Sequence, residues 1–194
     1  MRVRGRIRAE TVAAGLLYLL ASTTSISLAG METRSPAVDA AIRALISGDR
    51  EKLVSLFRYF EGAISPNEVK RDRQVVGVYF DLLKEHFGRP ERLEPTQTTA
   101  PGFVNIYIES ATPDLWRNSD CVFRAYAFRT GFADKRRRYP AEVVFDVCFD
   151  RANHAWLRKV DVHLSNPDEE TVRRAQLFFR RFRQEVDKVS GPRT

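Results

Sequence analysis

An aspartate and a histidine stand two residues apart in a stretch that reads as a β-strand. Asp161 and His163 would therefore point to the same face of a sheet. A carboxylate beside an imidazole can orient the ring and let it act as a general base. Glu142 and Asp146, on the preceding predicted strand, would point to that face as well. The competing interpretation is that these charges form cross-strand ion pairs on the wet face of an antiparallel sheet.

The other motifs that would identify an enzyme or a metal site are missing from the sequence. It has no GxSxG, no phosphate-binding P-loop and no GxGxxG. Its three histidines, His86, His154 and His163, do not have the HExxH or HxH spacing of metal ligands. We therefore expect no metal and no cofactor, and Asp161 and His163 remain the only catalytic candidates.

Four predicted strands position these residues, and polarity suggests how the strands pair. The strands are 103–110, 120–129, 141–150 and 155–164. In the pairing that best separates apolar from polar side chains, Asp146 faces both Arg124 and Lys159, and Glu142 faces His163. Arg124, Asp146 and Lys159 are then candidate ligand-binding residues. The dry face would carry Phe123, Ala125, Val143, Phe145, Val147, Trp156, Val160, Val162 and Leu164, with Arg158 as the one exception beside Val147.

The two cysteines, Cys121 and Cys148, give a separate constraint on the register. In an oxidising compartment they suggest one disulfide. The pairing above points them to opposite faces, whereas a shift by one residue that brings them together sets Arg124 opposite Phe145. A β-bulge near Cys121 would reconcile the two requirements, and we expect the disulfide to form.

The N-terminus predicts export. A basic segment, 1–8, precedes an apolar run, 11–21, that is too short to cross a bilayer comfortably as a helix. Small residues at 27 and 29 predict cleavage after Ala29. We therefore expect a signal peptide over 1–29, a single domain over 30–194 and a periplasmic or secreted protein. An uncleaved membrane anchor is the alternative.

The formal net charge of +7 is uneven along the chain. Part of it lies in the predicted signal peptide, which weakens the case for nucleic acid binding. Four consecutive cations, Lys135, Arg136, Arg137 and Arg138, fall in a predicted hairpin loop. They suggest contact with anionic lipid headgroups, an envelope polymer or an acidic partner, or else they are simply solvated.

Helices are predicted before and after the four strands in the sequence. Ser35-Pro36 and Ser65-Pro66 are typical helix starts, and the first three helices should end at Gly48, at about Phe60 and at about Phe87. A last helix should run to about Val189. Its apolar stripe would pack on the sheet or on another helix, or else form a homodimer through 168–189.

The segment AIRALISGDREKLVSLF, from Ala41 to Phe57, resembles the start of domains of the nuclear-transport-factor-2-like (cystatin-like α+β) superfamily. The similarity covers about 40–165 and implies helices followed by a curved antiparallel sheet that together enclose a cone-shaped pocket. Some members are isomerases or dehydratases that use Asp or His in this cone, and many are non-catalytic. No catalytic motif of the superfamily is matched residue by residue, and the long C-terminal helix departs from its pattern.

These observations predict an α+β fold with three N-terminal helices, a four-stranded antiparallel sheet and a long C-terminal helix packed on it. The function that we expect is that of an exported non-catalytic module binding a small ligand or an anionic envelope partner. One alternative is a cone-pocket enzyme of the isomerase or dehydratase kind, using Asp161 and His163. The other is a structural protein of the envelope that works by oligomerising.

Overall fold

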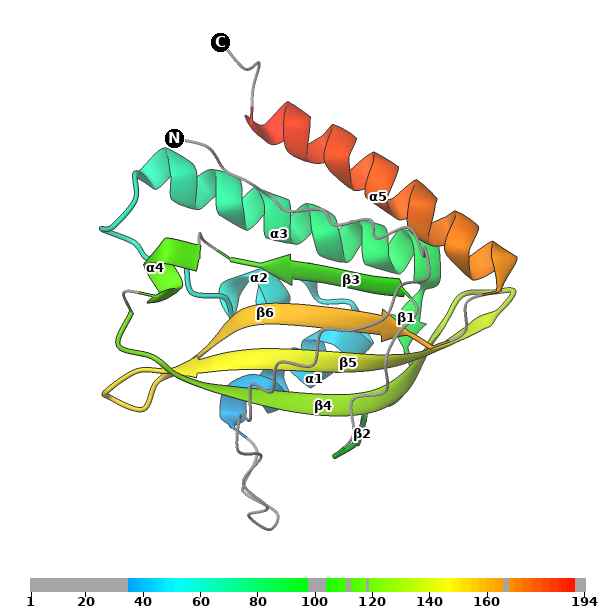
Figure 1. Cartoon of the computed structure of the whole chain (residues 1–194), viewed down its shortest axis with the longest axis horizontal. Coiled ribbons are helices and arrows are strands. Elements are labelled where there is room, and N and C mark those ends of the chain that lie inside the picture. The colour runs from blue at the N-terminus through cyan, green and yellow to red at the C-terminus, as the bar shows by residue number, and fades with distance from the viewer. Residues whose placement is uncertain (1–34, 98–103, 111–112, 118, 166–167, 191–194) are drawn as a thin grey trace, which may run out of the picture. The chain divides into compact units, whose positions relative to one another are not determined.

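The computed structural model has the α+β architecture expected from the sequence (Figure 1). It describes residues 35–97, 104–110, 113–117, 119–165 and 168–190. The helices are α1 (Pro36–Ser47), α2 (Arg50–Ser55), α3 (Pro66–Phe87), α4 (Pro113–Arg117) and α5 (Glu169–Ser190). The strands are β1 (Arg89–Pro90), β2 (Glu94–Pro95), β3 (Val104–Glu109), β4 (Val122–Ala133), β5 (Arg138–Phe149) and β6 (Ala155–Leu164). The predicted signal peptide, 1–29, lies outside the described residues.

Serine and aspartate caps start the N-terminal helices. The Ser35 hydroxyl accepts the backbone N–H of Ala37, and Ser65 forms a reciprocal capping box with Glu68. The second helix ends at Ser55, before the predicted end at about Phe60. The backbone leaves the helix because it joins the sheet at this point: Phe57 pairs with Leu157 of β6, and the N–H of Arg58 donates to the Leu157 carbonyl at 3.2 Å.

The sheet is antiparallel with the strand order β1-β4-β5-β6-β3, and β2 also pairs with β4. The four predicted strands correspond to β3, β4, β5 and β6. The prediction missed β1 and β2 because each has two residues, which is too short to show alternation. Both contain a proline, Pro90 or Pro95, a residue that sheets tolerate at their edges.

One face of the sheet packs against α1, α2 and α3, which share a single hydrophobic core with it. In Figure 1, α1 and α2 lie behind the strands. Phe145, Val160 and Val162 are fully buried on this face, and the Tyr79 hydroxyl of α3 donates to the Ile106 carbonyl of β3 at 2.9 Å. The space between the helices and the sheet is therefore filled by apolar and aromatic side chains.

Helix α5 packs mainly against α3, which corrects the expectation that it lies on the sheet. The Phe178 ring meets Tyr79 and Phe87 of α3 at centroid distances of 5.8 and 6.4 Å. Phe178 is therefore buried between the two helices. Within the described ranges, no helix is both long enough and apolar enough to span a membrane.

The predicted pairing of β4 with β5 is wrong by one residue. Phe123 lies opposite Cys148, so Arg124 faces Val147 instead of Asp146. A one-residue slip moves every side chain of a strand to the other face. Phe123 and Ala125 therefore leave the predicted dry face, and Cys121 moves to the face of Cys148.

The predicted pairing of β5 with β6 is confirmed over most of its length. Glu142 faces His163 and Asp146 faces Lys159, as expected. The register then shifts, because Val147 faces Leu157 and leaves Arg158 outside the ladder as a β-bulge. Beyond this bulge, Trp156 faces Cys148 instead of Phe149 and joins the opposite face.

The structure joins Cys121 to Cys148 by a disulfide, with their Cα atoms 5.2 Å apart. The expected cross-link is therefore present, but the predicted bulge near Cys121 is wrong. The register of the β4–β5 pair brings the two cysteines together, and the bulge lies in β6.

Candidate functional site

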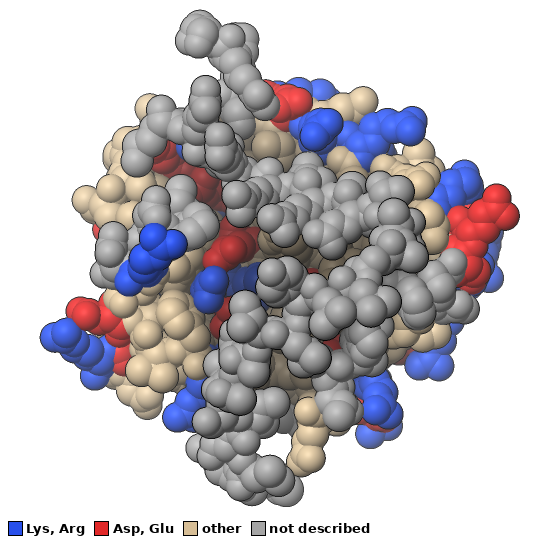
Figure 2. Space-filling model, in the orientation of Figure 1, with Lys and Arg blue, Asp and Glu red and all other residues tan. Residues whose placement is uncertain are grey.

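The face of the sheet turned away from the helical core carries the polar residues singled out from the sequence. We call it the outer face and define it by Tyr107, Glu109, Glu142, Asp146, Lys159, Asp161 and His163. These residues alternate with the buried residues of β3, β5 and β6, so alternation within the strands explains their common orientation. In the part of this side that Figure 2 shows, basic and acidic atoms lie interspersed.

Asp161 is the centre of the first polar group on the outer face. Its carboxylate accepts a hydrogen bond from the Lys159 ammonium at 2.7 Å and lies 3.3 Å from Nε2 of His163. Burial by itself raises the pKa of Asp161, but the contacts with His163 and Lys159 outweigh it and the net pKa is lowered. The close contact with Asp161 raises the pKa of His163.

The sequence prediction that Asp161 and His163 are neighbours is therefore correct. The two groups lie within ion-pair distance, but Oδ1 of Asp161 accepts no well-aligned hydrogen bond from the described residues, and Lys159 bonds to the other oxygen of the same carboxylate. Nδ1 of His163 has no hydrogen-bond partner in the part of the chain that the structure describes. Glu142, directly across the ladder, adds a negative charge that also favours protonated His163.

Arg158 is the centre of the second polar group. Its guanidinium lies 2.8 Å from Glu109 and 3.3 Å from Asp146, and it stacks over the ring of Phe123 at 4.8 Å. Burial raises the pKa of Asp146, while the Arg158 charge acts in the opposite direction. The sequence analysis missed this group because it assumed regular alternation through Arg158.

The predicted ligand-binding set is only partly assembled. Asp146 and Lys159 lie opposite each other, but Arg124 belongs to the other face and its guanidinium lies 5.4 Å from the Phe149 ring centre. The structure therefore brings two of these three residues together.

Neither of the two surface cavities that we describe is lined by Asp161 or His163. One is an open depression where the β4–β5 hairpin meets α5, lined by Arg137, Asp168, Glu169, Glu170 and Arg173. The other is a small cavity beside α2 and α3. Across the described residues, no group of three His, Cys, Asp or Glu side chains is arranged to hold a metal ion.

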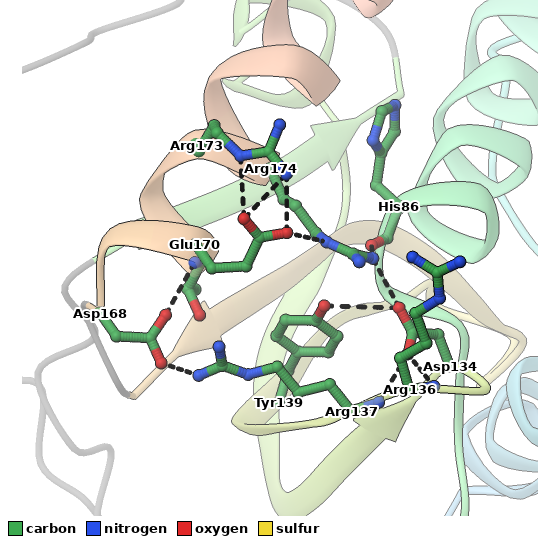
Figure 3. A network of polar contacts seen from close by, with 10 residues as sticks. His86, Asp134, Arg136, Arg137, Tyr139, Asp168, Glu170, Arg173 and Arg174 are labelled. Carbon is green, nitrogen blue, oxygen red and sulfur yellow. Dashed lines mark hydrogen bonds and ion pairs between the residues drawn. The ribbon is translucent and has the colours of Figure 1, made fainter.

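The hairpin between β4 and β5 has its own network of polar contacts (Figure 3). Asp134 organises its turn, because one carboxylate oxygen accepts the backbone N–H groups of both Arg136 and Arg137 at 2.7 Å. These hydrogen bonds, the one from Arg136 first, lower the pKa of Asp134. The turn is therefore fixed by its own side chain.

Arg174 of α5 links this turn to α5 itself and to the end of α3. Its guanidinium donates to Asp134 at 2.5 Å, to Glu170 at 2.9 Å and to the backbone carbonyl of His86 at 2.9 Å. Arg137 also forms an ion pair with Asp168, the residue whose carboxylate caps α5 at the N–H of Thr171. We call this set of contacts the hairpin clamp.

The four basic residues predicted to lie in the loop have different surroundings, and Arg138 is the first residue of β5. Arg137 is paired with Asp168, and Arg138 lies 3.6 Å from Glu91. Lys135 and Arg136 are exposed and make no ion pair with a carboxylate of the described residues. Figure 3 shows the Arg136 guanidinium outside the dashed contacts.

The sequence analysis did not predict the clamp residues Asp134, Asp168 and Arg174. An aspartate directly before a basic run is a signal for a side-chain-capped turn and could have identified Asp134. The pairing with α5 joins residues 40 positions apart and left no local signal.

No family model, no curated protein and no solved structure matches this chain.

Proposed function

We propose that this protein is an exported, non-catalytic α+β module that binds an anionic membrane surface through Lys135 and Arg136. The observation that carries the proposal is the exposure of these two cations on a turn held by the hairpin clamp. A cation on an ordered turn loses less conformational entropy on binding than a cation on a flexible loop.

The charges on the outer face are a weaker basis for binding an anion. Lys159 and His163 both contact Asp161, and Arg158 contacts Glu109 and Asp146. An incoming anion would have to compete with these carboxylates. Lys135 and Arg136 have no such competitor among the described residues.

The interaction should be weak and reversible. A Lys or Arg near an anionic bilayer contributes about 1 kcal/mol, so two of them supply about 2 kcal/mol. Arg137 is engaged by Asp168, whereas the exposed ion pair with Glu91 holds Arg138 only weakly, so Arg138 can add about 1 kcal/mol. Such an attraction between exposed charges is screened by salt.

Export and a distant relationship to the nuclear-transport-factor-2-like superfamily are part of this proposal. The predicted signal peptide and the disulfide support export. The order of three helices before an antiparallel sheet supports the relationship. The long α5 after the last strand is a departure from that superfamily.

A cone-pocket enzyme is the competing function, and two observations argue against it. Asp161 and His163 belong to the face opposite the helical core, and the core between helices and sheet is filled by buried side chains. Binding of a small ligand in such a cone is disfavoured for the same reason. An oligomerising role through 168–189 is also less favoured, because Phe178 of α5 packs on α3 of the same chain.

The test is the transverse relaxation rate of the backbone amides of the mature protein, residues 30–194, which reports weak binding, measured with phosphatidylglycerol vesicles and with phosphatidylcholine vesicles at low salt. We expect binding only to the anionic vesicles and loss of binding as salt is raised. The double variant Lys135→Gln/Arg136→Gln should lose most of this binding.

The matched control is Lys52→Gln/Lys70→Gln, which removes the same charge from exposed positions on α2 and α3. It should bind like the wild type. Equal loss in both double variants would mean that net charge alone drives binding, and retention by the first variant would refute the proposed contact. Binding to an acidic protein or polymer but not to these vesicles would also overturn it.

A further inference from the structure

The disulfide has a cation directly beside it. Nη1 of Arg58 lies 3.2 Å from Sγ of Cys121 and 3.7 Å from Sγ of Cys148. The Arg58 backbone is fixed by its hydrogen bond to Leu157, and its guanidinium also lies over the Phe60 ring at 4.7 Å. Among the described residues, no carboxylate forms an ion pair with Arg58.

The acidic residues closest in sequence to the cysteines bond to other groups. Asp120 is paired with Arg151 at 3.0 Å, and Asp150 accepts hydrogen bonds from the turn at Ala152 and His154. The charge that contacts the sulfurs is therefore positive. A neutral disulfide gains little from such a cation, whereas a thiolate gains much more.

We propose that Cys121–Cys148 is a thiol–disulfide exchange site, with Arg58 as the residue that stabilises the departing thiolate. The site would react with a small dithiol or with a dithiol protein, and this function is independent of membrane binding. Many structural disulfides only cross-link the chain, and the guanidinium contact distinguishes this one from them.

The accessibility of the two sulfurs assigns their roles. Cys148 is fully buried, whereas Cys121 is partly exposed. An incoming thiolate would attack Sγ of Cys121, a new S–S bond would form there, and the bond to Cys148 would break. The electron pair leaves on Sγ of Cys148, beside Arg58.

The second thiol of the reductant then completes the exchange. It attacks the mixed disulfide at the reductant's own sulfur, which releases Cys121 and closes the oxidised dithiol. The reductant loses two electrons and two protons, and the two cysteines take up both. In the reverse direction, the reduced chain transfers two electrons to a disulfide.

The test is equilibration of the mature protein with mixtures of reduced and oxidised dithiothreitol at pH 7, together with the rate constant for its reduction. We expect Arg58→Gln to slow reduction about tenfold and to shift the equilibrium about tenfold toward the disulfide, ~30 mV for this two-electron couple. Arg58→Lys should recover part of both effects.

The control is Arg183→Gln on the exposed side of α5, which removes the same charge and should leave both quantities unchanged. If the reduction rate constant and the equilibrium constant of Arg58→Gln both lay within about twofold of the wild-type values, the role of Arg58 would be overturned, since loss of a charge-assisted contact predicts a larger change.

A second measurement uses only the wild-type chain, in case Arg58→Gln does not fold. The native disulfide-bonded protein is mixed with reduced glutathione, quenched with acid at early times and mapped by mass spectrometry. We expect the mixed disulfide on Cys121. Its accumulation on Cys148, or no mixed disulfide under native conditions, would refute the exchange site.

Discussion

The guanidinium of Arg158 lies 3.3 Å from the carboxylate of Asp146, although regular alternation would place the two side chains on opposite faces of the sheet. The bulge at Arg158 makes the contact possible by inserting one residue into β6. The same arginine pairs with Glu109 of β3, so one side chain links three neighbouring strands.

Replacing Arg158 should therefore destabilise the fold. We expect Arg158→Ala to lower the free energy of unfolding by about 2 kcal/mol, because it removes a charge-assisted hydrogen bond to Glu109 and an ion pair with Asp146. It should also raise the pKa of Asp146 further. Urea denaturation at pH 7 measures the loss.

The control for this variant is Arg151→Ala, which breaks an ion pair with Asp120 whose side chains are 83% and 67% exposed. Exposed pairs of this kind contribute little, so we expect no measurable change. Equal stability of both variants would mean that the Arg158 contacts do not stabilise the bulge.

His163 should make the stability depend on pH. Since Asp161 raises the pKa of His163 in the folded chain, the protonated ring stabilises the fold below the unfolded value, about 6.5. This stabilisation is lost as the pH rises through the folded pKa. Asp161, whose pKa is lowered, keeps its contribution at every pH above its unfolded value, about 3.9.

The measurement is urea denaturation of the wild type and His163→Gln from pH 5.5 to pH 8.5. We expect the variant to be about 1–2 kcal/mol less stable at pH 5.5 and the difference to shrink toward pH 8.5. His86 and His154 are the same in both proteins, so the comparison isolates the effect of His163. A difference that grows with pH would contradict the proposed pair.

Gly88 occupies a position that no other residue can take without displacing the backbone. It ends α3 with φ of +82°, and a Cβ there would overlap the carbonyl oxygen of Ala133 in β4. We expect Gly88→Ala to lower the melting temperature and to cost at least about 2 kcal/mol of stability.

Gly62 supplies the control for Gly88, because its φ is +94° but no atom lies within 4 Å of an added Cβ. Gly62→Ala should cost only the backbone strain, about 1 kcal/mol. If the two variants were equally stable, the close approach of Gly88 to β4 would be refuted.

Phe178 should be the main anchor of α5. Its ring is 1% exposed and contacts Tyr79, Phe87 and Phe182, so Phe178→Ala should cost about 3–5 kcal/mol. Val186→Ala, at a half-buried position one turn from the end of α5, should cost less than about 1 kcal/mol. If denaturation curves showed a larger loss of stability for Val186→Ala than for Phe178→Ala, this packing would be contradicted.

Local sequence signals predicted much of this fold. Ser35, Ser65 and the prolines that follow them fixed two helix starts, because caps act on neighbouring backbone groups. Alternation in β5 and β6 gave the correct partners for Glu142 and Asp146, since both strands have one dry face.

The failures have equally specific causes. The register that best separates apolar from polar side chains is wrong for β4, because the apolar residues Phe123 and Ala125 lie on the outer face and Arg124 lies on the face of the helical core. The cysteine pair carried the correct constraint, and it conflicted with polarity. The bulge at Arg158 and the clamp from Arg174 to Asp134 depend on contacts between distant segments, which no local pattern reports.

The central claim is that the turn at Lys135 and Arg136 contacts an anionic membrane surface, and NMR can locate that contact without any mutation. Amide shifts of residues 30–194 are compared on adding phosphatidylglycerol-containing bicelles and zwitterionic bicelles. We predict that the anionic bicelles shift residues 134–138 most and that the zwitterionic ones leave them unchanged. Shifts concentrated at Lys159, Asp161 and His163, or none at all, would contradict the claim.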